Sequence, residues 1–276
     1  MKFGVHVSIA GGIQNAPINA HKKGCEVFQF FSRSPRGGKP TYTKETIEKF
    51  KSNCEKFGFT EYYIHTPYYI NLASSNDRIR HGSITAIRDE LEVGSRLGAK
   101  YVMTHLGSAK DYSESKAQQL VIKGIKEILK SYKGTTILLL ENSAGSGQII
   151  GDEIDELGKI MKGVSSNKVG ICYDTCHGFA SGYDIRTKLA LNKTLKEFDK
   201  YIGLDKLKLF HFNDSKTELG SKRDRHENIG KGFIGKTAFD LIINHPKLKK
   251  VDAVLETHDV VEDNIPSLNL LKKLRK

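Results

Sequence analysis

Histidine and acidic residues recur in this chain at the ends of short apolar segments. Imidazole nitrogens and carboxylate oxygens are side-chain ligands that zinc and similar divalent ions take in proteins. One such residue is most often a satisfied polar group, but six in succession are costly to bury unless they share partners. The sequence therefore predicts a metal centre, for which the segment ends supply His65, His105, Glu141, Asp174, His211 and Glu256.

Two short motifs enlarge this set. In Asp174-Thr-Cys-His177 an acid at the tip of a strand precedes an imidazole past the bend at His177-Gly178, although a capping Asp and a surface His are the alternative. In Asp224-Arg-His226 residues two apart in an extended segment point the same way and can hold one ion. The resulting five histidines and four carboxylates exceed the needs of one tetrahedral ion and suit about three ions that share carboxylates.

The elements that must position these residues alternate regularly between strands and amphipathic helices. The pattern predicts eight strands, over residues 2–7, 27–31, 62–65, 101–105, 136–141, 169–174, 206–212 and 253–256. Eight strand–helix units without a linker predict a single (β/α)8 TIM barrel over residues 1–276, with an open doubly wound sheet as the alternative. In a barrel the C-terminal ends of the strands share one face, where the chemistry is located.

Charge and cysteine content bear on partners and location. The chain has 44 basic and 32 acidic residues and a net charge of +12, which is compatible with a nucleic-acid partner. No segment is apolar enough to cross a bilayer or to serve as a signal peptide, so no membrane partner is expected. The four cysteines show no disulfide spacing and predict a reducing, cytoplasmic location, with Cys172 and Cys176 as small buried core residues rather than ligands.

Basic residues gather in the predicted strand-to-helix loops, where phosphate contacts would be made. Solvated loop charges are the alternative, and lysines on outer helix faces fit that alternative better. The loop residues are Arg33, Arg36, Lys39, Lys110, Lys216, Lys222, Arg223, Arg225 and Lys231.

The order of the motifs along the chain resembles that of the endonuclease IV family of abasic-site DNA endonucleases. The resemblance covers essentially the whole chain, and Asp-Thr-Cys-His followed some fifty residues later by Asp-Arg-His is its most specific part. The motifs are His6-Val-Ser, His65-Thr-Pro-Tyr, His105-Leu-Gly-Ser, Leu140-Glu141-Asn142, Asp174-Thr-Cys-His177, His211-Phe-Asn-Asp, Asp224-Arg-His226 and Leu255-Glu256-Thr257.

The resemblance implies a cluster of three zinc ions in a (β/α)8 barrel. Carried over residue by residue, it implies a first zinc site of His65, His105 and Glu141, a second of Glu141, Asp174, His211 and Glu256, and a third of His177, Asp224 and His226. Glu141 would bridge two sites, and it and Glu256 would serve catalysis. Three divalent ions and four carboxylates leave a charge of about +2, which suits a phosphodiester, while manganese, iron or cobalt are not excluded by this ligand set.

The activity that the resemblance implies is hydrolysis of duplex DNA on the 5′ side of abasic sites. The products would be a 3′-hydroxyl and a 5′-deoxyribose phosphate, and blocked 3′ ends would also be trimmed. A monomer is expected. The competing reading is a metal-dependent sugar isomerase or epimerase on a related barrel, which would leave Asp224 and His226 without a role. A non-catalytic nucleic-acid-binding module ranks last, because it needs no set of nine ligands.

DNA contacts are also implied by the resemblance. Arg36 and Tyr68 match side chains that penetrate the DNA, although Tyr69 replaces the family's usual leucine, and Gly37 and Leu106 are further departures. Tyr68 and Tyr69 could stack on bases, with a packed loop anchor as the alternative. Lys222 and Arg223 are expected to contact the DNA backbone. His6 is expected to form a hydrogen bond to a metal ligand.

Overall fold

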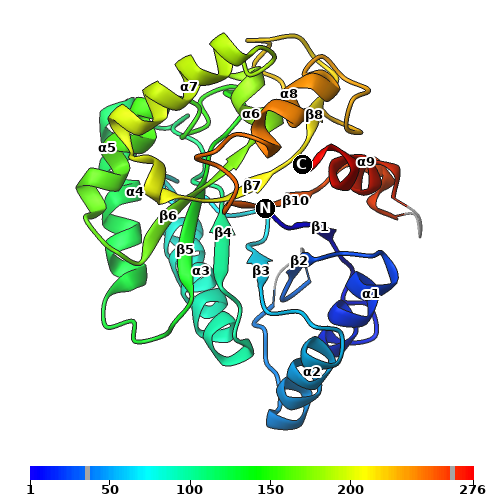
Figure 1. Cartoon of the computed structure of the whole chain (residues 1–276). Coiled ribbons are helices and arrows are strands. Elements are labelled where there is room, and N and C mark those ends of the chain that lie inside the picture. Colours follow the sequence, from blue (N-terminus) through cyan, green and yellow to red (C-terminus); the bar gives the residue numbers. More distant parts are fainter. Residues whose placement is uncertain (35–37, 262–264) are drawn as a thin grey trace.

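A closed barrel of parallel strands forms the centre of the molecule (Figure 1). The structure, a computed structural model, describes residues 1–34, 38–261 and 265–276. Within these residues eight strands close in the order β1-β10-β7-β6-β5-β4-β3-β2. They are β1 (Phe3–His6), β2 (Val27–Phe31), β3 (Tyr62–His65), β4 (Tyr101–Thr104), β5 (Ile137–Glu141), β6 (Val169–Asp174), β7 (Leu207–His211) and β10 (Asp252–Leu255). The (β/α)8 prediction is confirmed and the open sheet is excluded, because β1 pairs with both β2 and β10.

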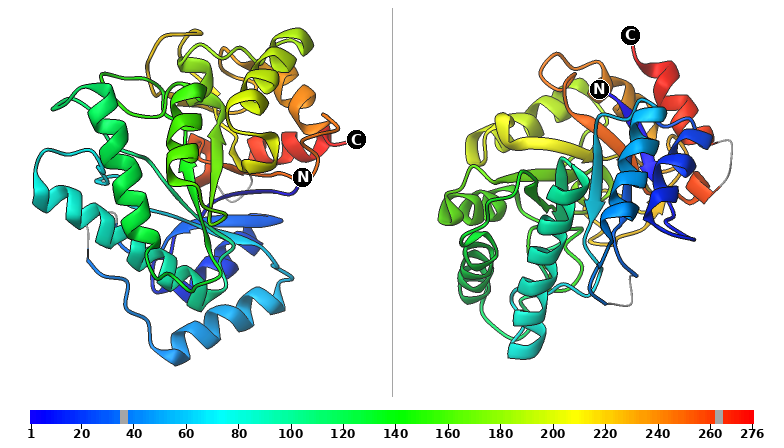
Figure 2. Two further views of the ribbon diagram at one scale, coloured as in Figure 1. Left: turned by 90° about the vertical axis from the view of Figure 1, so that its left-hand side faces the viewer. Right: turned by 90° about the horizontal axis from the view of Figure 1, so that it is seen from below.

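Helices surround this barrel on its outer side (Figure 2). The α-helices are α1 (Ala16–Lys22), α2 (Lys44–Lys56), α3 (Asp77–Leu97), α4 (Glu114–Leu129), α5 (Ile154–Val164), α6 (Thr175–Ala180), α7 (Lys188–Tyr201), α8 (Gly235–Ile243) and α9 (Pro266–Leu274). Within the described ranges the short 3-10 turns are η1 (Ile13–Asn15), η2 (Leu204–Lys206) and η3 (His258–Val261). Among the described residues, no helix has the length and apolar character needed to cross a membrane.

Local sequence explains where α3 begins and ends. The side chain of Asn76 accepts hydrogen bonds from the backbone N–H groups of Arg78 and Ile79, which satisfies two donors of the first turn. Gly98 follows the last turn with φ of 88°, a left-handed conformation that favours glycine. The buried face of α3 includes Ile87 and Leu91. The start and the end of this helix are therefore explained by its flanking residues.

Apolar side chains pack on both faces of the strands. Between the strands and the helices lies the larger core, in which Phe28, Phe50 and Tyr62 contact one another. A smaller core fills the barrel interior with one or two residues from each contributing strand, namely Val27, Tyr63, Tyr101, Met103, Leu139, Cys172, Leu209 and Val254. Cys172 thus packs as the small buried residue that the sequence predicts.

Two elements depart from the expected pattern. Strand β6 ends at Asp174, and α6 begins with the next residue, so the chain turns before the expected bend at His177-Gly178. The Asp174 carboxylate causes this early turn, because its Oδ1 accepts a hydrogen bond from the backbone N–H of His177 at 2.9 Å and caps the helix. The second departure lies in the loop after β7, where β8 (Asp214–Ser215) and β9 (His226–Glu227) form an antiparallel ribbon.

Candidate metal centre

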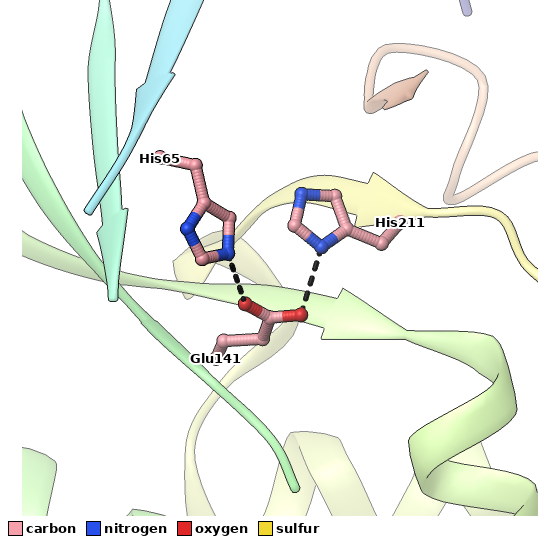
Figure 3. A group of neighbouring side chains, drawn as sticks. All are labelled: His65, Glu141 and His211. Atoms are coloured by element: carbon pink, nitrogen blue, oxygen red, sulfur yellow. Dashed lines mark hydrogen bonds and ion pairs between the residues drawn. The ribbon is translucent and has the colours of Figure 1, made fainter. Parts of the chain in front are cut away.

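Glu141, at the end of β5, lies between imidazoles from β3 and β7, the strands two places away on either side of the barrel order. One carboxylate oxygen, Oε2, is 3.2 Å from His65 Nε2, and the other, Oε1, is 2.8 Å from His211 Nδ1. Figure 3 shows each of the two rings facing a different oxygen of this carboxylate. His105 Nε2, just beyond β4, is 3.6 Å from Oε2. All but His105 are buried, so these groups face one another rather than water.

Two further acids extend the group toward β6 and β10. Glu141, Asp174, His211 and Glu256 each offer one ligand atom within 4.8 Å of the others. Glu256 follows the last residue of β10, and its Oε2 lies 3.5 Å from His211 Nδ1. The four residues predicted for the second metal site are therefore brought together, and Glu141 also faces the residues predicted for the first.

The third predicted group gathers where α6 meets the β8–β9 ribbon. Asp224 lies between two imidazoles, with Oδ2 3.2 Å from His177 Nε2 and Oδ1 3.2 Å from His226 Nε2. His226 Nε2 is also 3.7 Å from Asp174 Oδ2, which links this group to the previous one. Pairing of Ser215 with His226 fixes the position of that imidazole. All nine predicted ligands therefore form one continuous cluster.

The ribbon is anchored by Asp214, a buried acid that ends the motif His211-Phe-Asn-Asp and had no predicted role. Asp214 has no exposed surface, and its carboxylate accepts hydrogen bonds from the backbone N–H groups of Gly230, Gly232, Ile234 and Gly235. A Cβ atom at Gly232 would lie 2.3 Å from the carbonyl oxygen of Ser215, so only glycine fits there. This turn fixes the base of the loop that carries Asp224 and His226.

The donor set fits a divalent metal ion. Among the described residues His226 Nε2 is buried and has no hydrogen-bond partner, although two carboxylates lie within 4 Å of it. An ion shared by these groups would satisfy that nitrogen. The nearby Cys176 thiol is a poorer ligand, because burial strongly raises its pKa and keeps it protonated. Nitrogen and oxygen donors of this kind suit zinc, and they also accept manganese or iron.

The metal-free cluster is held by opposite charges. Burial alone would raise the pKa of Glu141, but the charges of His105 and His211 outweigh it and hold that pKa well below the usual value. Burial likewise disfavours a charged His177, yet the charge of Asp174 and the hydrogen bond with Asp224 raise its pKa to about 10. His177 therefore carries a proton at neutral pH, which a metal ion must displace.

A pH dependence of metal binding follows from this proton. Because the pKa of His177 is raised to about 10, we expect the apparent metal affinity of its group to rise about tenfold per pH unit between pH 7 and 9 for each displaced proton. The stability of the metal-free protein should change in the opposite direction. The contribution of His177 is fully present below about pH 6.5 and is lost as the pH rises toward 10. Chelator competition and thermal unfolding at three pH values would measure both, and a metal affinity independent of pH would contradict the expectation.

Two asparagines that belong to the motifs but had no predicted role support the acids. The backbone N–H of Asp174 donates to Asn142 Oδ1 at 2.6 Å, and Asn213 Nδ2 donates to Asp174 Oδ2 at 2.7 Å. Asn213 Oδ1 also accepts from the backbone N–H of Glu256 at 3.0 Å. Asn142 follows Glu141 directly, and Asn213 lies two residues after His211, so proximity to a ligand was the available signal. His6 Nδ1 lies 4.0 Å from Glu256 Oε1, too far for the predicted hydrogen bond, and 3.0 Å from Gln29 Nε2, which itself donates to Glu256.

The predicted DNA contacts have different environments. Tyr68 and Tyr69 are 67% and 44% exposed, and the ring of Tyr68 packs edge-on against Phe31. Both tyrosines line a hollow of about 440 Å³ that also reaches His105 and His177. Exposure at the mouth of the cluster leaves these rings available to a ligand.

The basic residues predicted to contact DNA phosphates differ in exposure and in their partners. Arg223 is exposed, whereas Lys222 Nζ donates to Asp152 Oδ2 at 2.7 Å. Arg33 is buried, where it pairs with Glu90 and donates to the carbonyl oxygen of Ala86, so its prediction as a phosphate contact is wrong. Arg36 and Gly37 lie outside the described residues.

The chain is similar in sequence and in fold to known proteins over nearly its whole length. Residues 18–274 match the model of the xylose isomerase-like TIM barrel family. A "Probable endonuclease 4" from Campylobacter concisus is 41% identical over 98% of each chain. The crystal structure of endonuclease IV from Thermus thermophilus superimposes with a TM-score of 0.88 at 30% identity, over 99% of this chain and 98% of that one. A D-tagatose 3-epimerase-like protein, with a TM-score of 0.73 at 21% identity over 99% and 95% of the two chains, shares the fold alone.

Proposed function

This chain belongs to the endonuclease IV family, and we propose that it is a DNA repair hydrolase that cleaves duplex DNA on the 5′ side of abasic sites. The products would be a 3′-hydroxyl and a 5′-deoxyribose phosphate. Trimming of blocked 3′ ends belongs to the same proposal, because it also hydrolyses a phosphodiester next to a damaged sugar. Three zinc ions are the proposed cofactors, with manganese as a possible substitute.

One observation supports this proposal most strongly. The nine predicted ligands form a continuous cluster in which Glu141 faces the first two proposed metal sites and His226 lies between Asp174 and Asp224. A sugar isomerase needs one or two ions and would leave Asp224 and His226 unused. Divalent ions held by these residues would supply positive charge to a phosphate and acidify water. Clustered ions suit phosphodiester hydrolysis better than isomerisation of a neutral sugar.

The residues of the chain then have separable tasks. Glu141 would hold two ions at a fixed separation, since its two oxygens point toward different imidazoles. Glu256 would complete one of the two coordination spheres beside His211. Arg223 and Lys222 would contact DNA phosphates, for which Lys222 must exchange its contact with Asp152. Tyr68 would fill the space opened in the DNA at the lesion.

Substitution of Tyr68 separates lesion recognition from phosphate contact. We expect Tyr68→Ala to weaken binding to abasic duplex by about 1–3 kcal/mol, the usual value of one stacking contact between an aromatic side chain and a base, while binding to intact duplex hardly changes. Arg223→Ala should instead weaken binding to both duplexes alike. It should also reduce the slope of the logarithm of the binding constant against the logarithm of salt concentration by about one. Salt titrations of both variants on both duplexes would test this. Equal losses on the two duplexes for Tyr68→Ala would make Tyr68 an ordinary loop anchor.

Metal content and cleavage together test the proposed function. Atomic emission on fully loaded protein should approach three divalent ions per chain, and the same protein should cut a duplex with one abasic site. The 3′ end of the product should be a substrate for a DNA polymerase. One ion per chain with full activity would contradict the three-ion proposal, and metal-loaded protein without cleavage would contradict the nuclease assignment.

A further inference from the structure

A buried glutamine on β2 connects two of the proposed metal ligands. Gln29 has no exposed surface although it lies in a strand that is otherwise apolar. Its Oε1 is 2.8 Å from His211 Nε2, and its Nε2 donates to Glu256 Oε1 at 2.7 Å. The same amide nitrogen lies 3.0 Å from His6 Nδ1. Both ends of the amide are therefore engaged by side chains of the protein.

The carboxylate of Glu256 determines which way this amide points. An ionised carboxylate only accepts hydrogen bonds, so the amide nitrogen and not the oxygen must face it at 2.7 Å. The oxygen of Gln29 then faces His211 and only accepts, which requires His211 Nε2 to carry a proton. The second proton of the amide is directed to His6, whose Nδ1 accepts it.

The orientation of the amide determines which atom of His211 and which atom of Glu256 can bind a metal ion. With a proton fixed on Nε2, Nδ1 is the nitrogen of His211 that can bind an ion, and Nδ1 is the one that lies beside Glu141 and Glu256. On Glu256 the amide engages Oε1 and leaves Oε2, which is 3.5 Å from His211 Nδ1. The two atoms that Gln29 leaves for a metal ion, His211 Nδ1 and Glu256 Oε2, therefore lie next to each other.

We propose that Gln29 is a positioning residue that presents His211 Nδ1 and Glu256 Oε2 to the same divalent ion. This inference rests on the proposed metal centre and goes beyond it, because it assigns the residue that sets the geometry of one ion. Partners of this kind, which hold a ligand from behind, commonly change metal affinity or activity by about 10–100-fold when they are removed. The side chain at position 29 must donate a hydrogen bond to Glu256 and accept one from His211. An ionised carboxylate cannot donate and a thioether does neither well, so neither can replace the amide.

Two variants of similar size test the role. Gln29→Met removes both hydrogen bonds, and Gln29→Glu keeps an acceptor toward His211 but sets a negative charge against Glu256. Gln118→Met is the matched control, because Gln118 also donates to a glutamate, Glu156, at 3.2 Å but lies on α4 away from the cluster. Zinc binding would be measured by competition with a chromophoric chelator, alongside thermal unfolding of the metal-free proteins.

We expect both Gln29 variants to bind one zinc ion about 10–100-fold more weakly while the remaining ions keep their affinity. Unfolding of metal-free Gln29→Glu should stay cooperative, so that the loss is not one of folding. Affinities for every ion equal to those of Gln118→Met would overturn the inference and leave the proposed function intact. Failure of the unaltered protein to bind zinc would overturn both.

A measurement on the unaltered protein avoids any question of variant folding. In the zinc-loaded protein, long-range nitrogen–proton NMR correlations of His211 should place the ring proton on Nε2. A proton on Nδ1 would overturn the role of Gln29, whatever the variants show.

Discussion

Replacement of Glu141 by glutamine is expected to reduce cleavage of abasic DNA by at least about 10³-fold, which corresponds to roughly 4 kcal/mol of activation free energy. The substitution keeps the shape of the side chain but removes a negative charge that two imidazoles and two proposed ions share. It also places an NH₂ group where a ligand oxygen is needed. DNA binding should change little, since the basic loop residues that would contact phosphates are not altered.

Single-turnover cleavage and gel-shift titration separate these two effects. Glu156→Gln is a suitable control, because Glu156 is a partly buried glutamate at the start of α5 that accepts from the backbone N–H of Gly151 and has no contact with the cluster. Its cleavage rate should match that of the unaltered protein. Near-normal cleavage by Glu141→Gln would show that Glu141 does not bridge two ions.

Removal of metal is expected to have the second large effect. Chelation should abolish cleavage and lower the stability of the fold, because ions that bind only the native state stabilise it in proportion to their affinity. At a free concentration about 1,000-fold above the dissociation constant, one ion contributes about 4 kcal/mol. For a chain of this length that shift corresponds to a melting temperature about 10 °C higher in the loaded protein.

The metal-free chain should nevertheless remain folded. Its histidines and acids neutralise one another, as the lowered pKa of Glu141 and the raised pKa of His177 show, and the barrel core does not depend on them. Calorimetry with and without chelator would measure the difference. Zinc should restore both melting temperature and cleavage, whereas magnesium should not, because magnesium prefers six oxygen ligands. Full activity in protein stripped of metal would contradict a metal-dependent mechanism.

Sequence alone predicted the barrel because its signals are local and repeated. Each strand is a short apolar run, and α3 carries both an asparagine cap and a glycine stop. The nine predicted ligands have local signals as well, since each one ends a strand, directly follows a strand or belongs to a short motif. Elements of two residues, such as β8 and β9, have no period to detect, and α6 was missed because it begins directly where β6 ends.

Contacts between distant segments could not be predicted in this way. Gln29 is a polar residue within an apolar strand, and its meaning depends on β7 and β10, which are brought to it only when the barrel closes. Lys222 was assigned from its charged surroundings, but its partner Asp152 lies 70 residues earlier in the chain. The buried pair of Arg33 and Glu90 was not predicted because the two residues are 57 positions apart in the chain.

The barrel closes between β1 and β10, two strands that are far apart in the order of synthesis. Lys2 donates its backbone N–H to Asp252 at 2.7 Å across a separation of 250 residues, and Glu256 follows this last strand to be made (Figure 1). A nascent chain on the ribosome therefore has neither the final seam of the barrel nor one of the four carboxylates until β10 has emerged. Prematurely terminated products that lack β10 would carry an open barrel and would lack one residue of the proposed metal centre. We therefore expect a chain that ends before β10 to be inactive in cleavage, because it lacks both Glu256 and the pairing of β1 with β10.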